Sequence, residues 1–306
     1  MREQVVMVGD NLPLVGVLSE PAPDKNSAPN TAVILLNSGV IHRVGSCRLS
    51  VTLARNLSER AGLATFRFDF SGIGDSEARR GTLTAAQAAV EEVQEVMDYL
   101  GQWKQFDRFI LYGLCSGAFA SYRTALSDQR VIGTAQLDGY CYRTLKSYIL
   151  HYAPRILSLS HWTQFVLRKL GLIKVKRGAE VSGIEERYFE VPNFAGYPPR
   201  QEVEQGLQKL NERGLNMLYV FFGDEHYKYQ KQFEDCFKSV AFGDNLTVIH
   251  HPNATHILSE PEDRKAVIKA ISDWAHNLVS HTHKPVSKGS QAGFRVGEWA
   301  SNENPN

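Results

Sequence analysis

The chain has 306 residues and a formal net charge of +1 at pH 7. This balance argues against nucleic acid or an anionic membrane surface as a partner. No apolar run approaches the roughly 20 residues of a membrane span, and the first residues, MREQVVMVGDNLPL, lack the long apolar core of a signal peptide. The four cysteines, at 47, 115, 141 and 236, show no CxxC spacing, which disfavours a metal site or a disulfide framework. These features predict a cytoplasmic globular protein without a membrane span.

Strands and helices are expected to alternate along most of the chain. In chain order the pattern predicts strands at 5–8 and 14–18, a buried strand at 31–37, a helix within 47–62, a strand at 63–70, a helix at 83–100, a strand at 108–115, a helix at 116–126, strands at 131–138, 215–223 and 246–252, and a helix at 259–278. Thr84 and Gln87 have the spacing of a capping box for the second of these helices. Such alternation favours an α/β fold with a mostly parallel central sheet covered by helices on both faces.

Two regions interrupt this alternation. Residues 141–213 form a long insertion between two strands, and its first half is helical and rich in aromatic residues. An insertion at the carboxyl edge of the sheet would lie over the crevice where open α/β sheets bind ligands, so we expect a helical cap. Residues 281–306 are polar and lack periodicity, which predicts a disordered tail. The α/β core is then made of residues 1–140 and 214–280.

The stretch ILYGLCSGAFAS, at 110–121, contains the frame G-x-C-x-G between a predicted strand and a predicted helix. This is the setting of a nucleophile elbow, in which a sharp turn exposes the central side chain above the sheet. A side chain at Gly113 or Gly117 would clash across so tight a turn. Cys115 is therefore the candidate nucleophile, and a helix N-terminus favours its thiolate. The alternative is a buried thiol beside two glycines that ease a turn.

A nucleophile on such a sheet needs an acid and a histidine later in the chain, in that order. His256 lies in the predicted loop between the last strand and the last helix and is the candidate base. Asp224 and Glu225 directly follow the penultimate strand, and either could orient the imidazole, with a slight preference for Asp224. Asp138, at the end of the strand after the elbow, is kept in reserve, its alternative role being that of a loop carboxylate bonded to backbone N–H groups.

Four ordered segments together resemble the α/β-hydrolase superfamily over about residues 5–280. ILLNSG stands at the strand and oxyanion loop, DFSGIGDS fits the D-x-x-G-x-G-x-S turn, GLCSG fits the elbow, and NATH fits the histidine loop. More closely, SGVIHRVGSCRLSVTLARNLSERAG, FRFDFSGIGDSE, YGLCSGA and YRTLKSYILHYAPRIL resemble the hydrolases encoded with exosortase-type protein-sorting systems, which tend to carry cysteine at the elbow. The family's usual His-Gly oxyanion pair is Asn37-Ser38 here, and His226 stands where its G-x-x-D pattern has the acid.

The resemblance implies an oxyanion hole made of backbone N–H groups. The expected donors are Gly39 and Val40, in the loop after the first buried strand, and Ser116, whose N–H would also begin a helix. His42 and Arg43 follow this loop and have two open roles, contact with a polar or anionic group of a substrate and ordering of the loop.

These residues predict a hydrolase of ester or thioester bonds that works through a Cys-His-Asp/Glu triad and an acyl-thioester intermediate. The expected partner is a small acyl ester or thioester, free or carrier-bound, and no cofactor motif is found. An acyltransferase uses the same site with another acceptor, and a lyase or C–C hydrolase uses it on another substrate. A binding protein that keeps the hydrolase fold without hydrolysis is the alternative from a different class.

Overall fold

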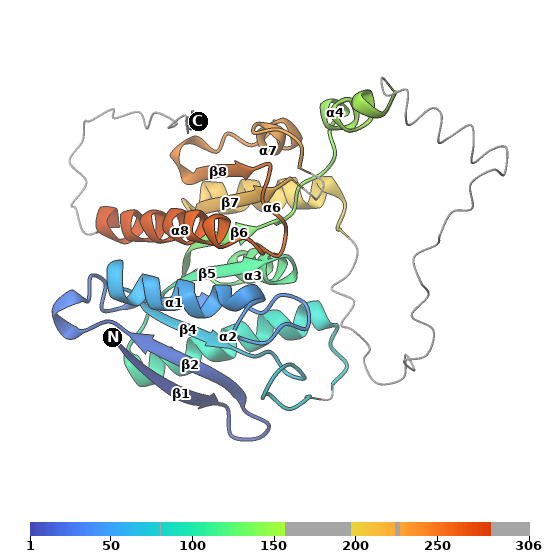
Figure 1. The fold of residues 1–306 in the computed structure, drawn as a ribbon. Helices are drawn as coiled ribbons and strands as arrows, with labels where there is room; N and C mark the ends of the chain where they lie inside the picture. Colours follow the sequence, from blue (N-terminus) through green and yellow to red (C-terminus); the bar gives the residue numbers. More distant parts are fainter. Residues whose placement is uncertain (80, 157–196, 224–226, 283–306) are drawn as a thin grey trace, which may run out of the picture.

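The computed structural model describes residues 1–79, 81–156, 197–223 and 227–282. Eight strands form one sheet in the order β1-β2-β4-β3-β5-β6-β7-β8 (Figure 1). The strands are β1 (Arg2–Val8), β2 (Leu14–Glu20), β3 (Thr31–Leu35), β4 (Ala64–Phe68), β5 (Arg108–Leu114), β6 (Val131–Leu137), β7 (Asn216–Phe222) and β8 (Leu246–His251). β2 runs antiparallel to both β1 and β4, and all other neighbours are parallel. The predicted mostly parallel sheet is confirmed.

Helices cover both faces of the sheet (Figure 1). The described helices are η1 (Pro23–Lys25), η2 (Ser46–Arg48), α1 (Leu49–Arg60), α2 (Ala85–Lys104), α3 (Ser116–Ser127), α4 (Leu145–Ile156), α6 (Arg200–Glu212), α7 (Gln232–Cys236), η3 (Gly243–Asn245) and α8 (Pro261–Thr282). α1 and α8 pack together on one face, and α2, α3 and α6 lie on the other. Thr84 caps α2 and forms the predicted capping box with Gln87.

The central strands are buried on both sides because helices cover both faces of the sheet. In β3, Val33 and Leu35 point into the cluster shared with α1 and α8, whereas Ile34 points into the cluster shared with α2 and α3. Five-residue strands with no exposed position, such as β3 and β4, are the result. Their carboxyl ends meet at one edge of the sheet, and this edge carries the candidate site.

The predicted cap is described only in part. α4 lies apart from the sheet in Figure 1 and exposes Leu145, Tyr148 and Ile149. α6 instead packs against α3, since the Tyr122 hydroxyl donates to the Val203 carbonyl at 3.1 Å. α6 therefore belongs to the layer that flanks the sheet. The middle of the insertion, 157–196, and most of the expected disordered tail, 283–306, lie outside the described residues, so the cap and the tail stay predictions.

Candidate active site

Cys115 lies between the last residue of β5 and the first residue of α3. Its backbone has φ 55° and ψ −116°, a conformation that costs a residue with a side chain of order 1–3 kcal/mol. The strain is maintained from the strand side, because the Cys115 N–H donates to the Leu137 carbonyl of β6 at 2.9 Å. The thiol is half-buried and not part of a disulfide. This is the strand–turn–helix geometry that the G-x-C-x-G frame predicts.

The two glycines of the frame are needed for close backbone contact. A Cβ atom on Gly113 would lie 2.1 Å from the carbonyl carbon of Gly117. A Cβ on Gly117 would lie 2.5 Å from the backbone oxygen of Asn37, in the loop after β3. The predicted clash is confirmed, and Gly117 also brings α3 against the loop that carries Gly39.

His256 lies in the loop between β8 and α8, and its imidazole is bound to Asp138. Nδ1 of His256 is 2.6 Å from Oδ2 of Asp138. The other carboxylate oxygen of Asp138 accepts a bond from the Phe222 N–H at 3.1 Å, which fixes the carboxylate between β7 and the histidine loop. The loop itself is held by η2, since the Ser46 hydroxyl donates to the Ile257 carbonyl at 2.8 Å.

The electrostatics of the site favour a charged imidazole. The pKa of His256 is raised to about 10, because hydrogen bonds to the Asp138 carboxylate and to Cys115 favour the protonated form more than burial opposes it. With Nδ1 committed to Asp138, the second ring nitrogen is the one left to meet the sulfur. The site thus favours an imidazolium next to the Cys115 sulfur.

The acid found beside His256 is the residue that the sequence kept in reserve. Asp138 follows β6 directly, is buried and has φ 46°. Asp224 and Glu225, the preferred acids on sequence grounds, lie outside the described residues. The sequence identifies Asp138 as a candidate acid because it follows the strand next to the elbow. The sequence does not show that the Asp138 carboxylate reaches His256.

The expected oxyanion donors lie beside the elbow. Gly39 and Val40 are the central residues of a turn closed by the bond from the Ile41 N–H to the Ser38 carbonyl at 3.0 Å. Gly39 has φ +54°, and a Cβ there would meet no atom within 4 Å, so the turn borders open space. Ser116 is the first residue of α3 and is buried. The Gly39 N–H and the start of α3 are in direct contact, because this N–H donates to Ser116 Oγ at 2.7 Å.

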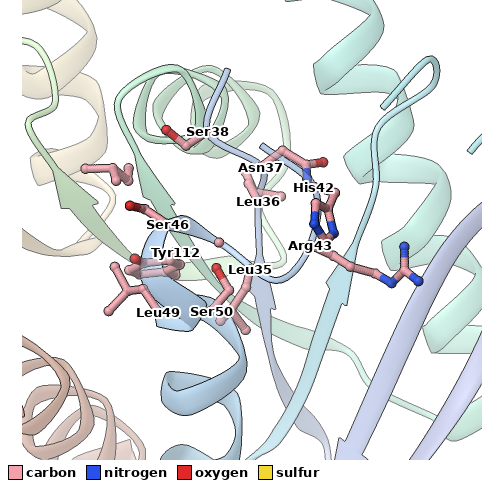
Figure 2. Close-up of a pocket in the computed structure, with 12 residues that line it drawn as sticks. Leu35, Leu36, Asn37, Ser38, His42, Arg43, Ser46, Leu49, Ser50 and Tyr112 are labelled. Atoms are coloured by element: carbon pink, nitrogen blue, oxygen red, sulfur yellow. The ribbon is translucent and has the colours of Figure 1, made fainter. Parts of the chain in front are cut away.

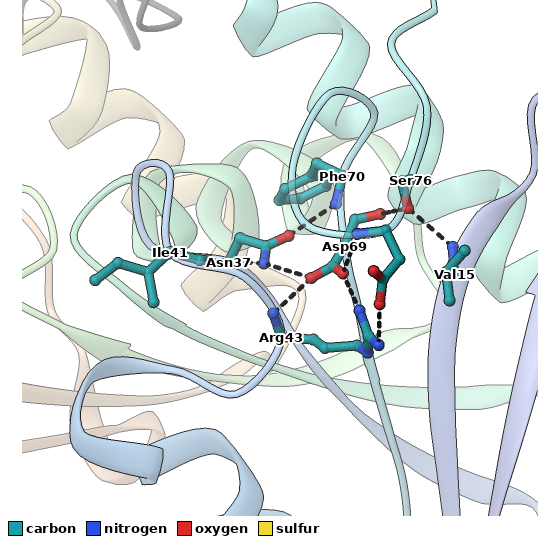
Figure 3. Close-up of polar contacts among 8 residues, drawn as sticks. Val15, Asn37, Ile41, Arg43, Asp69, Phe70 and Ser76 are labelled. Carbon is teal, nitrogen blue, oxygen red and sulfur yellow. Dashed lines mark hydrogen bonds and ion pairs between the residues drawn. The ribbon is translucent and has the colours of Figure 1, made fainter.

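A buried aspartate, Asp69, holds both ends of the loop that contains Gly39 (Figure 3). Oδ1 of Asp69 accepts from the Asn37 amide at 3.3 Å and from the Arg43 backbone N–H at 2.5 Å. Its Oδ2 pairs with the Arg43 guanidinium, which also pairs with Asp75. Oδ1 of Asn37 in turn accepts from the Phe70 N–H at 2.8 Å. Arg43 therefore has a loop-ordering role, one of the two that the sequence left open.

The same loop encloses a small pocket (Figure 2). Its volume is about 10 Å³, the space of about one water molecule. The lining residues are Leu35, Leu36, Asn37, Ser38, His42, Arg43, Gly45, Ser46, Leu49, Ser50, Tyr112 and Leu114. A pocket of this size has no room for an acyl group, and its lining residues pack the loop against the start of α1.

Two further observations concern the described part of the chain. Within it, no group of three or more His, Cys, Asp or Glu side chains is arranged to hold a metal ion. None of its helices has the length and apolar character to cross a bilayer.

Comparison with known proteins gives the fold. No family model and no curated protein matches the sequence. Among solved structures, Est1E from Butyrivibrio proteoclasticus is 16% identical, covers 90% of this chain and 99% of its own, and has a TM-score of 0.56. The monoacylglycerol lipase of Paleococcus ferrophilus is 18% identical over 88% and 99% of the two chains, with a TM-score of 0.53. XC6422 from Xanthomonas campestris, described as an α/β serine hydrolase without a lid, is 14% identical over 89% and 94%, with a TM-score of 0.52. The chain has the α/β-hydrolase fold.

Proposed function

We propose that this protein hydrolyses ester or thioester bonds, with Cys115 as nucleophile, His256 as acid and base, and Asp138 as the group that orients the imidazole. The observation that carries the proposal is the 2.6 Å contact between His256 and Asp138 next to a strained elbow cysteine. The fold adds support, since similar structures include a lipase and a serine hydrolase. Asp138 takes the role for which Asp224 and Glu225 were the first candidates.

Acylation begins from the thiolate–imidazolium pair. The sulfur of Cys115 forms a bond to the carbonyl carbon, and the carbonyl oxygen becomes an oxyanion next to the turn of Gly39 and the start of α3. The bond to the leaving alkoxide or thiolate then breaks, and His256 gives its proton to that group. Asp138 stabilises the imidazolium before transfer and holds the ring in one orientation.

Deacylation needs a neutral imidazole, and acylation supplies it. Once Cys115 is a thioester it carries no charge, so one of the two hydrogen bonds that raise the pKa of His256 loses its charged partner. The neutral ring takes a proton from water, whose oxygen attacks the thioester carbon. The carbon–sulfur bond breaks, a carboxylic acid leaves, and the Cys115 thiolate is restored.

The same residues would serve an acyltransferase, with another acceptor in place of water, or a lyase or C–C hydrolase. A binding protein without catalysis would have no need for an ordered Cys-His-Asp arrangement, which argues for an enzyme. The narrower resemblance to exosortase-associated hydrolases stays a prediction, as does the expected carrier-bound form of the substrate.

The test is intact mass after incubation with acyl thioesters and activated esters of graded chain length. The proposal expects an acyl adduct on Cys115 with turnover, and neither in Cys115→Ala. Cys47→Ala is the matched control, because Cys47 is a free, exposed thiol that activated esters can acylate without catalysis. Turnover that survives in Cys115→Ala would contradict the proposal.

A further inference from the structure

The Gly39 N–H, the expected oxyanion donor from the loop after β3, already has a partner in the free protein. It donates to Ser116 Oγ at 2.7 Å. Gly39 belongs to the half-buried turn of Ser38–Ile41, and Ser116 follows Cys115 at the start of α3. The contact thus joins the two backbone segments that would surround a substrate carbonyl attacked by Cys115.

The distance from the Gly39 nitrogen to Ser116 Oγ is the distance at which an oxyanion-hole donor binds an oxyanion. Donors of an oxyanion hole lie 2.7–3.1 Å from the oxygen that they stabilise. Relative to the Gly39 N–H, the Ser116 oxygen therefore has the distance that a substrate oxygen must have. Two oxygens cannot share this position, so the hydroxyl and the oxyanion compete for one N–H.

We propose that the Ser116 hydroxyl is a stand-in for the oxyanion in the free enzyme and must release the Gly39 N–H when Cys115 attacks a carbonyl. This inference rests on the proposed function. The hydroxyl keeps the N–H paired and holds the turn, in which Gly39 has φ +54°. A charged oxygen is the stronger acceptor and displaces the neutral hydroxyl as charge develops. The Ser116 backbone N–H, at the helix N-terminus, is the second donor and takes no part in the exchange.

Replacement of the hydroxyl tests the competition. In Ser116→Ala the Gly39 N–H does not have to break a hydrogen bond before it binds the oxyanion. We therefore expect kcat/KM for an activated thioester to rise about 2- to 10-fold, which corresponds to the net free energy of one hydrogen bond. The affinity for a simple alkyl aldehyde should rise by the same factor, because Cys115 adds to its carbonyl and turns the oxygen into the oxyanion of a hemithioacetal. Ser121→Ala is the matched control: it removes a buried α3 hydroxyl that donates to the Gly117 carbonyl at 2.9 Å and does not contact Gly39.

Alkylation of Cys115 by iodoacetamide separates the two proposals. This displacement forms no oxyanion, so its rate should be equal in wild type and Ser116→Ala. Equal alkylation with unchanged or slower acylation in Ser116→Ala would overturn the inference, since the hydroxyl would then support the site and not compete with the substrate. Normal alkylation without any acyl or aldehyde adduct in either protein would instead contradict the proposed function, and the inference with it.

Discussion

Nδ1 of His256 lies 2.6 Å from Oδ2 of Asp138, although 118 residues separate them in the chain. Asp138 lies beside the elbow because β6 pairs directly with β5, with Leu114 opposite Leu137. Cys115 and Asp138 are the residues that follow these two partners. Both leave the strand with a positive φ, of 55° and 46°. The proposed nucleophile and acid therefore turn out of adjacent strands at the same edge of the sheet, and His256 reaches them from the loop before α8.

Asp138→Asn should remove most of the activity without unfolding the protein. An asparagine keeps an oxygen for the Phe222 N–H but loses the charge that stabilises the imidazolium. The loss of an orienting carboxylate in a triad lowers kcat by up to about 10⁴-fold. Steady-state kinetics with an activated thioester, with the melting temperature as a check on folding, measure the effect.

Asp224→Asn and Glu225→Gln are the matched controls for this experiment, since each neutralises one of the other two acids that the sequence suggested. Both variants should keep kcat within a few-fold of wild type. A large loss of kcat in either variant, together with a small loss in Asp138→Asn, would show that the triad acid is the residue after β7 and not Asp138.

The fold and the elbow geometry of Cys115 could be predicted from local patterns, but the carboxylate partner of His256 could not. Cys115 is marked by two glycines whose close contacts depend only on neighbouring residues. The identity of the acid depends on which strand end the loop of His256 reaches, and this is set by packing between segments far apart in sequence. The anchor of the Gly39 loop was missed for the same reason. Asp69 belonged to a recognised turn motif, but its bonds to Asn37 and Arg43 exist only in the folded chain.

His256 should titrate near pH 10, well above its ordinary pKa of 6.5. Between these values the folded protein binds a proton that the unfolded chain has lost. The stabilisation from this group is therefore complete below about pH 6.5 and disappears as the pH rises through about 10. NMR titration of the imidazole measures the pKa, and urea unfolding from pH 6 to 10 measures the loss of stability.

The two causes of this shift can be separated by substitution. Asp138→Asn should lower the pKa of His256 more than Cys115→Ala does, because the bond to Asp138 makes the larger contribution. A pKa near 6.5 in the wild type, or a larger change in Cys115→Ala, would show that Asp138 does not hold the imidazole in solution.

Two other histidines, His250 and His251, should lower the free energy of unfolding at acid pH. Burial lowers the pKa of His250 and of His251 on β8, and each Nε2 atom is buried with no hydrogen-bond partner among the described residues. As the pH falls below about 6.5, both histidines are protonated in the unfolded chain but stay neutral in the folded protein. The free energy of unfolding should therefore fall. The double variant His250→Gln, His251→Gln should have a flatter acid limb in urea unfolding between pH 7 and 5.

The control for the acid limb is His276→Gln, which removes an exposed histidine from α8. A flattening confined to the double variant would assign the acid limb to the two histidines on β8. An equal change of slope in His276→Gln and in the double variant would mean that burial on β8 is not the cause.

Asp69→Asn should destabilise the fold far more than Asp75→Asn, although both carboxylates pair with Arg43. Asp69 is fully buried and also accepts from the Asn37 amide, whereas the Asp75 side chain is 67% exposed. Breaking a buried ion pair from one side costs about 3–5 kcal/mol, and an exposed pair contributes about 0–1 kcal/mol. Urea unfolding at pH 7 compares the two variants with wild type. Equal and small losses would show that the Arg43 pair with Asp75 is enough to hold the loop, and that the buried carboxylate is not its anchor.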